Sequence, residues 1–293
     1  MADYRFPWWD HLMHKHGGAR TRGLAAELKE LRARSGLTTR EVAKRTGFSV
    51  ATVNRMETGR RRITPEDAAS LLAVYGVTGA ARARILVLAR DSDLSGWWET
   101  DDGDLPVHLP ALGCFESDAS RIVHVAMLRI PGLLQTADYI RTALIAVDFP
   151  AEKRKAMAAA RLQRQKVLLG RTAPNYLAII DEAALRRPTG SRELMAAQCH
   201  HLVAMAERPH IDIRIIPFDR GSHAGLDGSY VQMEFAKAGP IIYLELVQSS
   251  MFRDAEHEVR PYLDTTDKLM KVALSSAESV KFLRRLAGEY GRE

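Results

Sequence analysis

The chain has 293 residues, 46% of them hydrophobic and 27% charged, which is typical of a soluble globular protein with a sizeable core and excludes a disordered chain. At roughly 100 to 200 residues per domain, this length predicts two domains. The first 90 residues hold 17 Lys and Arg against 8 Asp and Glu, a net charge of +9, whereas the rest holds 25 against 28, a net −3. This asymmetry fits a nucleic-acid-binding module joined to another domain, or a basic solvated face.

Nothing in the sequence indicates a membrane or secretory segment. No run of about 18 apolar residues occurs, and the N-terminus lacks the apolar core of a signal peptide. The two cysteines, Cys114 and Cys199, are far apart and lack the spacing of a metal or redox motif. We therefore expect a cytoplasmic protein with no membrane partner and no disulfide framework.

The first segment, residues 1–20, combines the adjacent Trp8 and Trp9 with histidines and basic residues. It shows neither helical nor strand periodicity. We predict an N-terminal arm that is poorly ordered, packs on another domain or follows DNA.

The stretch TTREVAKRTGFSVATVNRMETGRRR, residues 38–62, predicts two short helices joined by a tight corner. Thr38 and Glu41 have the spacing of a capping box, which starts the first helix. Gly47 ends that helix because it tolerates a left-handed backbone. Ser49 is a suitable N-cap for the second helix. Two helices joined in this way form a helix-turn-helix.

The second of these helices is expected to have one buried and one exposed side. Val53 and Met56 face inward at helical spacing, so the opposite side is free to enter a major groove. Arg55 can offer a bidentate fork to a guanine edge, and the hydroxyl groups and arginines at both ends suit phosphates. We predict DNA contacts from Thr39, Ser49, Val50, Ala51, Thr52, Asn54, Arg55, Thr58, Arg60, Arg61 and Arg62. The alternative for the arginine run is a solvated loop.

Residues 22–90 resemble the DNA-binding domain of the XRE family, the repressor-type helix-turn-helix of phage repressors and Cro. The phrase LTTREVAKRTGFSVATVNRMETGRRRITPEDAASLLAVYGV carries the resemblance. It implies an all-α, lambda-repressor-like domain of five helices, which we place at residues 21–91. It also implies an ion pair between Arg32 and Glu57 that ties the reading helix to the scaffold. The family usually has Gln where this chain has Thr39, so the phosphate contact of that Gln is not implied here.

The remaining chain divides into a connector and a second domain. Residues 92–110 are acidic and contain Gly, Pro and Ser, which indicates a linker, with Trp97 and Trp98 expected to pack onto one of the domains. Residues 111–293 mix helical segments with short apolar runs such as YLAIID and IDIRIIPF. Helices and strands do not alternate strictly, so we predict an α+β domain whose last helical stretch begins at Pro261.

Residues 111–293 hold no recognisable catalytic pattern. In GSHAGLDG the Ser and His are adjacent, which is not the spacing of a nucleophile elbow. Cys199, His200 and His201 are consecutive on a predicted helix, so their side chains point about 100° apart and cannot all bind one metal ion. No P-loop, dinucleotide fingerprint or HExxH motif occurs. We therefore expect no enzymatic activity, no cofactor and no metal.

The phrases IPGLLQTADYIRTAL, IIDEAALRRPTGS and IRIIPFDRGSHAGLDGSYVQMEF resemble the C-terminal region of actinobacterial WhiJ-like regulators. The resemblance covers most of residues 111–285. It implies a transcription factor linked to development or secondary metabolism, often acting with a small companion protein in an antitoxin-like arrangement. From the residues themselves, PGLLQT and GSHAGLDG are candidates for a partner groove or effector pocket, with core packing and a structural turn as the alternatives. The candidate residues are Leu133, Leu134, Gln135, His223 and Asp227.

These features together predict a sequence-specific DNA-binding transcriptional regulator. Its partner is double-stranded DNA, which adds the nucleoid to the expected cytoplasmic location, and its C-terminal domain is expected to form a homodimer and to sense a companion protein or a small ligand. Two alternatives remain. The helix-turn-helix can serve as a protein-interaction module in an antitoxin-like scaffold, or the C-terminal domain can be an enzyme that DNA binding regulates.

Overall fold

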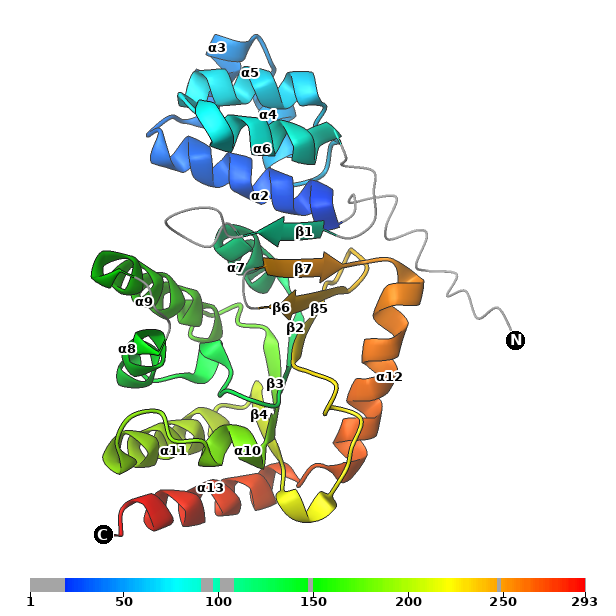
Figure 1. Cartoon of the computed structure of the whole chain (residues 1–293). Coiled ribbons are helices and arrows are strands. Elements are labelled where there is room, and N and C mark those ends of the chain that lie inside the picture. Colours follow the sequence, from blue (N-terminus) through cyan, green and yellow to red (C-terminus); the bar gives the residue numbers. More distant parts are fainter. Residues whose placement is uncertain (1–18, 91–96, 101–107, 147–149, 247–248, 293) are drawn as a thin grey trace, which may run out of the picture.

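The computed structural model describes residues 19–90, 97–100, 108–146, 150–246 and 249–292 (Figure 1). The predicted N-terminal arm, with its paired tryptophans, lies outside the described residues except for its last two positions. A helical domain lies at one end of the molecule, and a sheet with helices on both faces makes up the rest (Figure 1).

Local capping chemistry sets the helices of the N-terminal domain. Thr38 and Glu41 form the predicted capping box, and Thr64 and Asp67 form a second one. Gly47 follows the first of these helices with a φ of 78°, as predicted from its tolerance of a left-handed backbone. The helices are α2 (Ala19–Arg34), α3 (Thr39–Thr46), α4 (Val50–Glu57), α5 (Pro65–Tyr75) and α6 (Gly79–Arg90).

One mixed sheet is the centre of the C-terminal domain. Its order is β1-β7-β6-β5-β2-β3-β4 within the described residues. Strands β2, β3 and β4 run parallel to one another, and the remaining neighbours pair antiparallel. The strands are β1 (Trp97–Thr100), β2 (Arg121–Ala126), β3 (Asn175–Asp181), β4 (Ile211–Ile216), β5 (Tyr230–Glu234), β6 (Ile241–Glu245) and β7 (Ser249–Arg253).

Helices cover both faces of this sheet (Figure 1). On one face, Val259 and Leu269 of α12 pack with Val125 and Ile179 of the central strands. The other helices lie on the opposite side, and the predicted α+β layout is confirmed. The helices of this domain are α7 (His108–Asp118), α8 (Ala137–Ile145), α9 (Ala151–Gln165), α10 (Glu182–Arg186), α11 (Arg192–Ala206), α12 (Glu256–Val272) and α13 (Ser276–Tyr290).

The predicted connector, residues 92–110, needs correction because part of it belongs to the C-terminal sheet. Trp97 and Trp98 lie in β1, which pairs antiparallel with β7 and forms one edge of the sheet. Helix α7 then begins at His108. The segment has the composition of a linker, but its strand partner lies far along the chain, and local periodicity does not show such a pairing.

The PGLLQT turn follows the core-packing alternative, since it is part of the core and forms no exposed groove. Leu133, Leu134 and Gln135 are all buried. The Gln165 side chain donates to two carbonyl groups of this turn, at 2.9 and 2.8 Å. The Gln198 side chain donates to the Leu134 carbonyl at 2.8 Å. The turn therefore holds α9 and α11 together.

His124, a partly buried residue of β2, makes the domain sensitive to acid. Burial, followed by the positive charge of Arg164, lowers the pKa of His124 from 6.5 to about 3. The unfolded chain takes up this proton near pH 6.5, whereas the folded chain does not, so stability is present above that pH and is lost as the pH falls. From about pH 7 to about pH 5 we expect the free energy of unfolding to fall by about 2 kcal/mol more in the wild type than in His124→Phe. Urea denaturation of both proteins at the two pH values measures this difference, and parallel pH profiles would contradict it.

The two domains meet through α2, which lies against α7 and β7 (Figure 1). The Ala19 backbone N–H donates to the Asp254 carboxylate. The guanidinium carbon of Arg22 lies 3.8 Å from the centre of the Phe235 ring and 5.0 Å from that of Phe115. Burial lowers the pKa of Arg22 to about 10. Helix α2 is therefore shared between the helix-turn-helix and the interface with the C-terminal domain.

Candidate nucleic-acid interface

The inner face of α4 fixes the position of this helix in the N-terminal domain. Val53 and Met56 are fully buried, as predicted. The Ser49 hydroxyl accepts a hydrogen bond from the Thr52 N–H at 3.0 Å, which is the predicted N-cap. The Thr52 hydroxyl lies 2.9 Å from the same oxygen, and Thr52 is buried. Thr52 therefore supports the cap and does not lie on the outer face, unlike the other predicted contacts of this helix.

The outer face of α4 presents polar and small apolar side chains to solvent. Val50, Ala51, Asn54, Arg55 and Thr58 are all exposed. The Thr58 hydroxyl donates to the Asn54 carbonyl at 2.8 Å, so this hydroxyl closes the helix end. The Asn54 amide and the Arg55 guanidinium are the groups of this face that can pair with base edges, and Val50 and Ala51 can contact a thymine methyl.

A buried ion pair ties α4 to α2. Arg32 Nε donates to Glu57 Oε1 at 2.7 Å, and the side chains are 18% and 4% exposed. Arg32 Nη1 donates to the Leu37 carbonyl at 2.9 Å, and the Tyr75 hydroxyl donates to Glu57 at 3.3 Å. The hydrogen bond to Glu57 raises the pKa of Arg32 above its ordinary value. The chain thus has the pair that the resemblance implied, in a position that holds the last turn of α4.

Basic side chains flank the outer face at the turn after α4. Arg60, Arg61 and Arg62 are exposed, and Thr39 is partly buried at the start of α3. Arg61 Nη2 lies 3.2 Å from Asp67 Oδ2, so this arginine is partly committed to the capping box of α5. A substitution of Arg61 would therefore change the start of α5 as well as a predicted phosphate contact, so it does not test DNA binding alone.

Gly59, at the end of α4, brings this helix against α2. Its φ is +64°, and a Cβ atom here would lie 3.2 Å from Arg22 Cγ and 3.4 Å from Arg22 Cα. The same arginine stacks on the aromatic rings of the C-terminal domain. The role of Arg22 was not predicted, because in the sequence it is one more basic residue of a helix. Only Gly59 indicated that another part of the chain approaches the end of α4 closely.

The predicted candidates in GSHAGLDG are not brought together as a site. The His223 side chain is buried, and its Nδ1 accepts the Gly225 N–H at 3.2 Å, so its Nε2 carries the proton and donates to Asp181 at 3.0 Å. Asp227 is exposed. The histidine therefore fastens its loop over the end of β3, which favours the structural-turn alternative.

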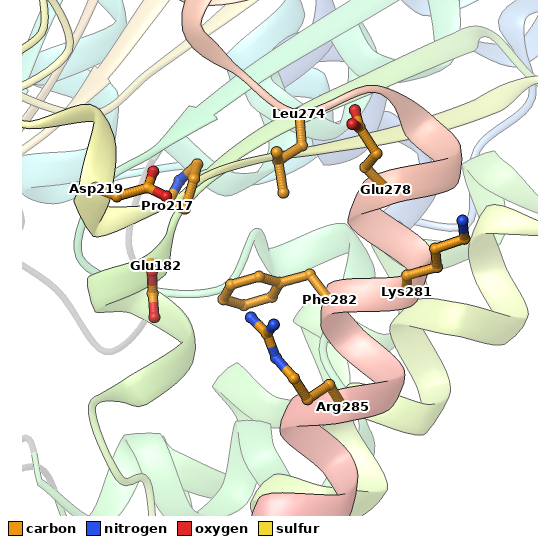
Figure 2. Close-up of a pocket in the computed structure, with 8 residues that line it drawn as sticks. All are labelled: Glu182, Pro217, Asp219, Leu274, Glu278, Lys281, Phe282 and Arg285. Carbon is orange, nitrogen blue, oxygen red and sulfur yellow. The ribbon is translucent and has the colours of Figure 1, made fainter.

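A pocket of about 530 Å³ lies between α13 and the residues that follow β3 and β4 (Figure 2). Phe282 and Arg285 point into it from α13 (Figure 2). Glu182 has both carboxylate oxygens in use, because Arg186 Nε donates at 2.5 Å and the Phe218 N–H at 2.8 Å. Acidic and basic side chains both surround the pocket, so its lining does not select one ligand charge. Its residues are Glu182, Pro217, Asp219, Leu274, Glu278, Lys281, Phe282 and Arg285.

The described residues contain no group of three or more His, Cys, Asp or Glu side chains placed to hold a metal ion. In the same part of the chain, no helix has both the length and the apolar character needed to cross a membrane. Cys114 and Cys199 are free thiols.

Comparisons with known families divide the chain as its fold does. Residues 24–85 match the model of a helix-turn-helix domain, and this range includes α3, α4 and the outer face of α4. Residues 109–285 match the model described as a domain of unknown function, DUF5753. Neither the curated proteins nor the solved structures gave a match.

Proposed function

Since the chain belongs to the DUF5753 family and carries a helix-turn-helix domain ahead of it, we propose that it is a sequence-specific DNA-binding transcriptional regulator of the XRE type. The observation that carries this proposal is the outer face of α4. Asn54 and Arg55 are exposed there, on a helix whose inner face is fully buried and whose end is tied by an ion pair. A rigid helix with free amide and guanidinium groups is suited to base recognition in a major groove.

In this proposal the two kinds of side chain have separate roles. Arg55 and Asn54 read base edges, with Val50 and Ala51 against a thymine methyl. Ser49, Thr39 and the arginines of the turn hold phosphates, which fixes the helix in the groove. The net charge of +9 in the first 90 residues favours the approach to DNA. As such a regulator, the protein would act in the cytoplasm, at the nucleoid.

We further propose that two chains bind one DNA site. Repressor-type helix-turn-helix domains bind as dimers, with reading helices about 34 Å apart on one face of the duplex. A homodimer formed through the C-terminal domain would meet this spacing and favour a near-palindromic sequence. Selection of bound fragments from random DNA, followed by sequencing, tests both points. Enrichment of single half-sites without two-fold symmetry would contradict the dimer.

The division of roles predicts different effects for two neighbouring arginines. Arg55→Ala should lower affinity for the selected sequence by about 1–3 kcal/mol and relax the preference at one base pair. Arg60→Ala should weaken binding to selected and random DNA alike, and it should reduce the slope of log affinity against log salt by about one. Fluorescence anisotropy over a range of salt concentrations measures both.

The matched control is Arg40→Ala, an exposed arginine of α3 that is not among the predicted contacts. It should change neither base preference nor affinity by more than a small amount. If Arg55→Ala and Arg60→Ala lose equally on selected and random DNA, the outer face of α4 does not read bases. If neither variant nor the wild type binds duplexes at low salt, the proposed function fails.

A further inference from the structure

A second pocket, of about 370 Å³, lies between α8 and the loop that joins α10 to α11. It is at the carboxyl ends of the parallel strands β2 and β3, where ligands of α/β sheets commonly bind. Its volume is in the range of small-molecule sites. The residues that line it are Leu128, Arg129, Tyr139, Thr142, Ala143, Ile145, Ala146, Arg187, Pro188, Thr189 and Gly190.

The charges of this lining have one sign. Arg129 and Arg187 are both exposed, and no acidic residue lines the pocket among those that the structure describes. Neither arginine forms an ion pair with a carboxylate in the described part of the chain. Two guanidinium groups at one pocket, with no carboxylate paired to them among the described residues, favour an anionic ligand. A planar carboxylate fits a guanidinium through two parallel hydrogen bonds.

The walls of the pocket are apolar and unusually exposed. Leu128 is 63% exposed and Ile145 is 68% exposed. Tyr139 and Ala143 lie deeper and are buried. Covering Leu128 and Ile145 with an apolar group of a ligand would remove their surface from water, which stabilises the complex by roughly 25 cal/mol per Å². The ligand therefore needs an apolar body as well as a negative charge.

The loop after α10 is held close to α8, which keeps the pocket formed. Gly190 has a φ of +80°, and a Cβ atom at this position would lie 3.0 Å from Thr142 Cγ2 and 3.3 Å from Leu194 Cδ1. Only a residue without a side chain allows this approach together with this backbone conformation. Arg187, which this loop carries, and Arg129, which follows β2, consequently lie at the opening of the same pocket.

From these features we propose that this pocket binds a small carboxylate with an aliphatic body, with Arg129 and Arg187 holding the carboxylate and Leu128 and Ile145 covering the chain. The pocket at α13 is larger, but its mixed charges do not define a ligand (Figure 2). The inference gives a site and a ligand class to the sensing role that the sequence predicts for the C-terminal domain, and it rests on the proposed function for its regulatory meaning alone.

Octanoate, octanol and octylamine are matched probes for the full-length protein, because they share the chain and differ in charge. Isothermal titration calorimetry should show octanoate binding about tenfold or more tightly than octanol, and octylamine more weakly than either. The double variant Arg129→Gln, Arg187→Gln should remove the preference for octanoate over octanol. Ile145→Asp should abolish octanoate binding, since it removes an apolar wall and adds a negative charge.

The matched control is Arg141→Gln. Arg141 is an exposed arginine of α8, the helix of Ile145, and it pairs with Asp138 outside the pocket. It should leave octanoate binding unchanged. Equal binding of the three probes, or an octanoate affinity that survives both pocket variants, would overturn the site. Titration uses no DNA, so a protein that binds its selected DNA but not octanoate keeps the proposed function and loses this site. A protein that binds octanoate with the expected preferences but ignores DNA supports the site alone.

Discussion

Replacing Arg32 by Met is expected to lower the free energy of unfolding of the N-terminal domain by about 3–5 kcal/mol. The Glu57 carboxylate is only 4% exposed, and without Arg32 it keeps one neutral partner, the Tyr75 hydroxyl. A buried charge that loses its counter-charge is among the most costly changes in a protein. Hydrogen exchange of the α4 amides in the full-length protein measures the loss, because it reports this domain separately.

Arg34→Met is the matched control for this prediction. Arg34 lies on the same helix and pairs with Glu30 at 3.1 Å, but both side chains are about half exposed. Such a pair contributes about 0.5 kcal/mol or less. The pair of Arg32 and Glu57 also holds the end of α4. Arg32→Met should therefore weaken DNA binding at temperatures where the domain is still folded, whereas Arg34→Met should not. Equal losses for the two variants would show that the buried pair has no special role.

The helix-turn-helix was predictable because the signals that define it are local. The capping box of Thr38 and Glu41, the N-cap Ser49 and the glycine after α3 each act within one turn of backbone. Helical spacing then separated the buried Val53 from the exposed Arg55. Thr52 was misplaced, because its hydroxyl completes the cap of its own helix, a detail that spacing does not show.

The features that were not predicted depend on contacts between distant parts of the chain. Strand β1 lies in a stretch with the acidic composition of a linker and becomes a strand only by pairing with β7. Helix α12 begins at Glu256, ahead of the predicted start at Pro261, because the proline lies inside the helix. For Leu133 and Leu134 the sequence left a groove and core packing open, and their burial, in a turn that accepts hydrogen bonds from α9 and α11, decides for core packing. Periodicity describes one segment at a time, so it cannot supply these partners.

The same limit applies to the pockets. Arg129 and Arg187 are separated by α8, α9, β3 and α10, and nothing in the sequence pairs them. They share an opening because β2 and β3 are parallel neighbours whose carboxyl ends lie at one edge of the sheet. Of the candidates from GSHAGLDG, His223 instead holds its own loop in place through a hydrogen bond to Asp181. Parallel topology, once known, is a better guide to such sites than residue type.

In the C-terminal domain, the largest effect of a single substitution is expected from Glu116→Leu. Glu116 accepts two hydrogen bonds from Arg164, at 2.8 and 2.5 Å, and the two side chains are 3% and 19% exposed. Burial alone lowers the pKa of Arg164, but the Glu116 carboxylate reverses this and raises it above its ordinary value. Removing the carboxylate leaves a buried cation beside His124, so the free energy of unfolding should fall by about 3–5 kcal/mol. Urea denaturation followed by circular dichroism measures the change.

Salt and a matched control distinguish this buried pair from a surface one. Asp264→Leu removes an exposed carboxylate that pairs with Arg260 at 2.9 Å on α12, and it should cost about 1 kcal/mol or less. High salt should reduce the small contribution of Asp264 and leave that of Glu116 nearly unchanged, since buried charges are screened little. A loss for Glu116→Leu that is small, or that disappears at high salt, would mean that water reaches Arg164. The low pKa of His124 depends on the same burial and on the Arg164 charge. Water at Arg164 would therefore also contradict the predicted acid sensitivity of His124.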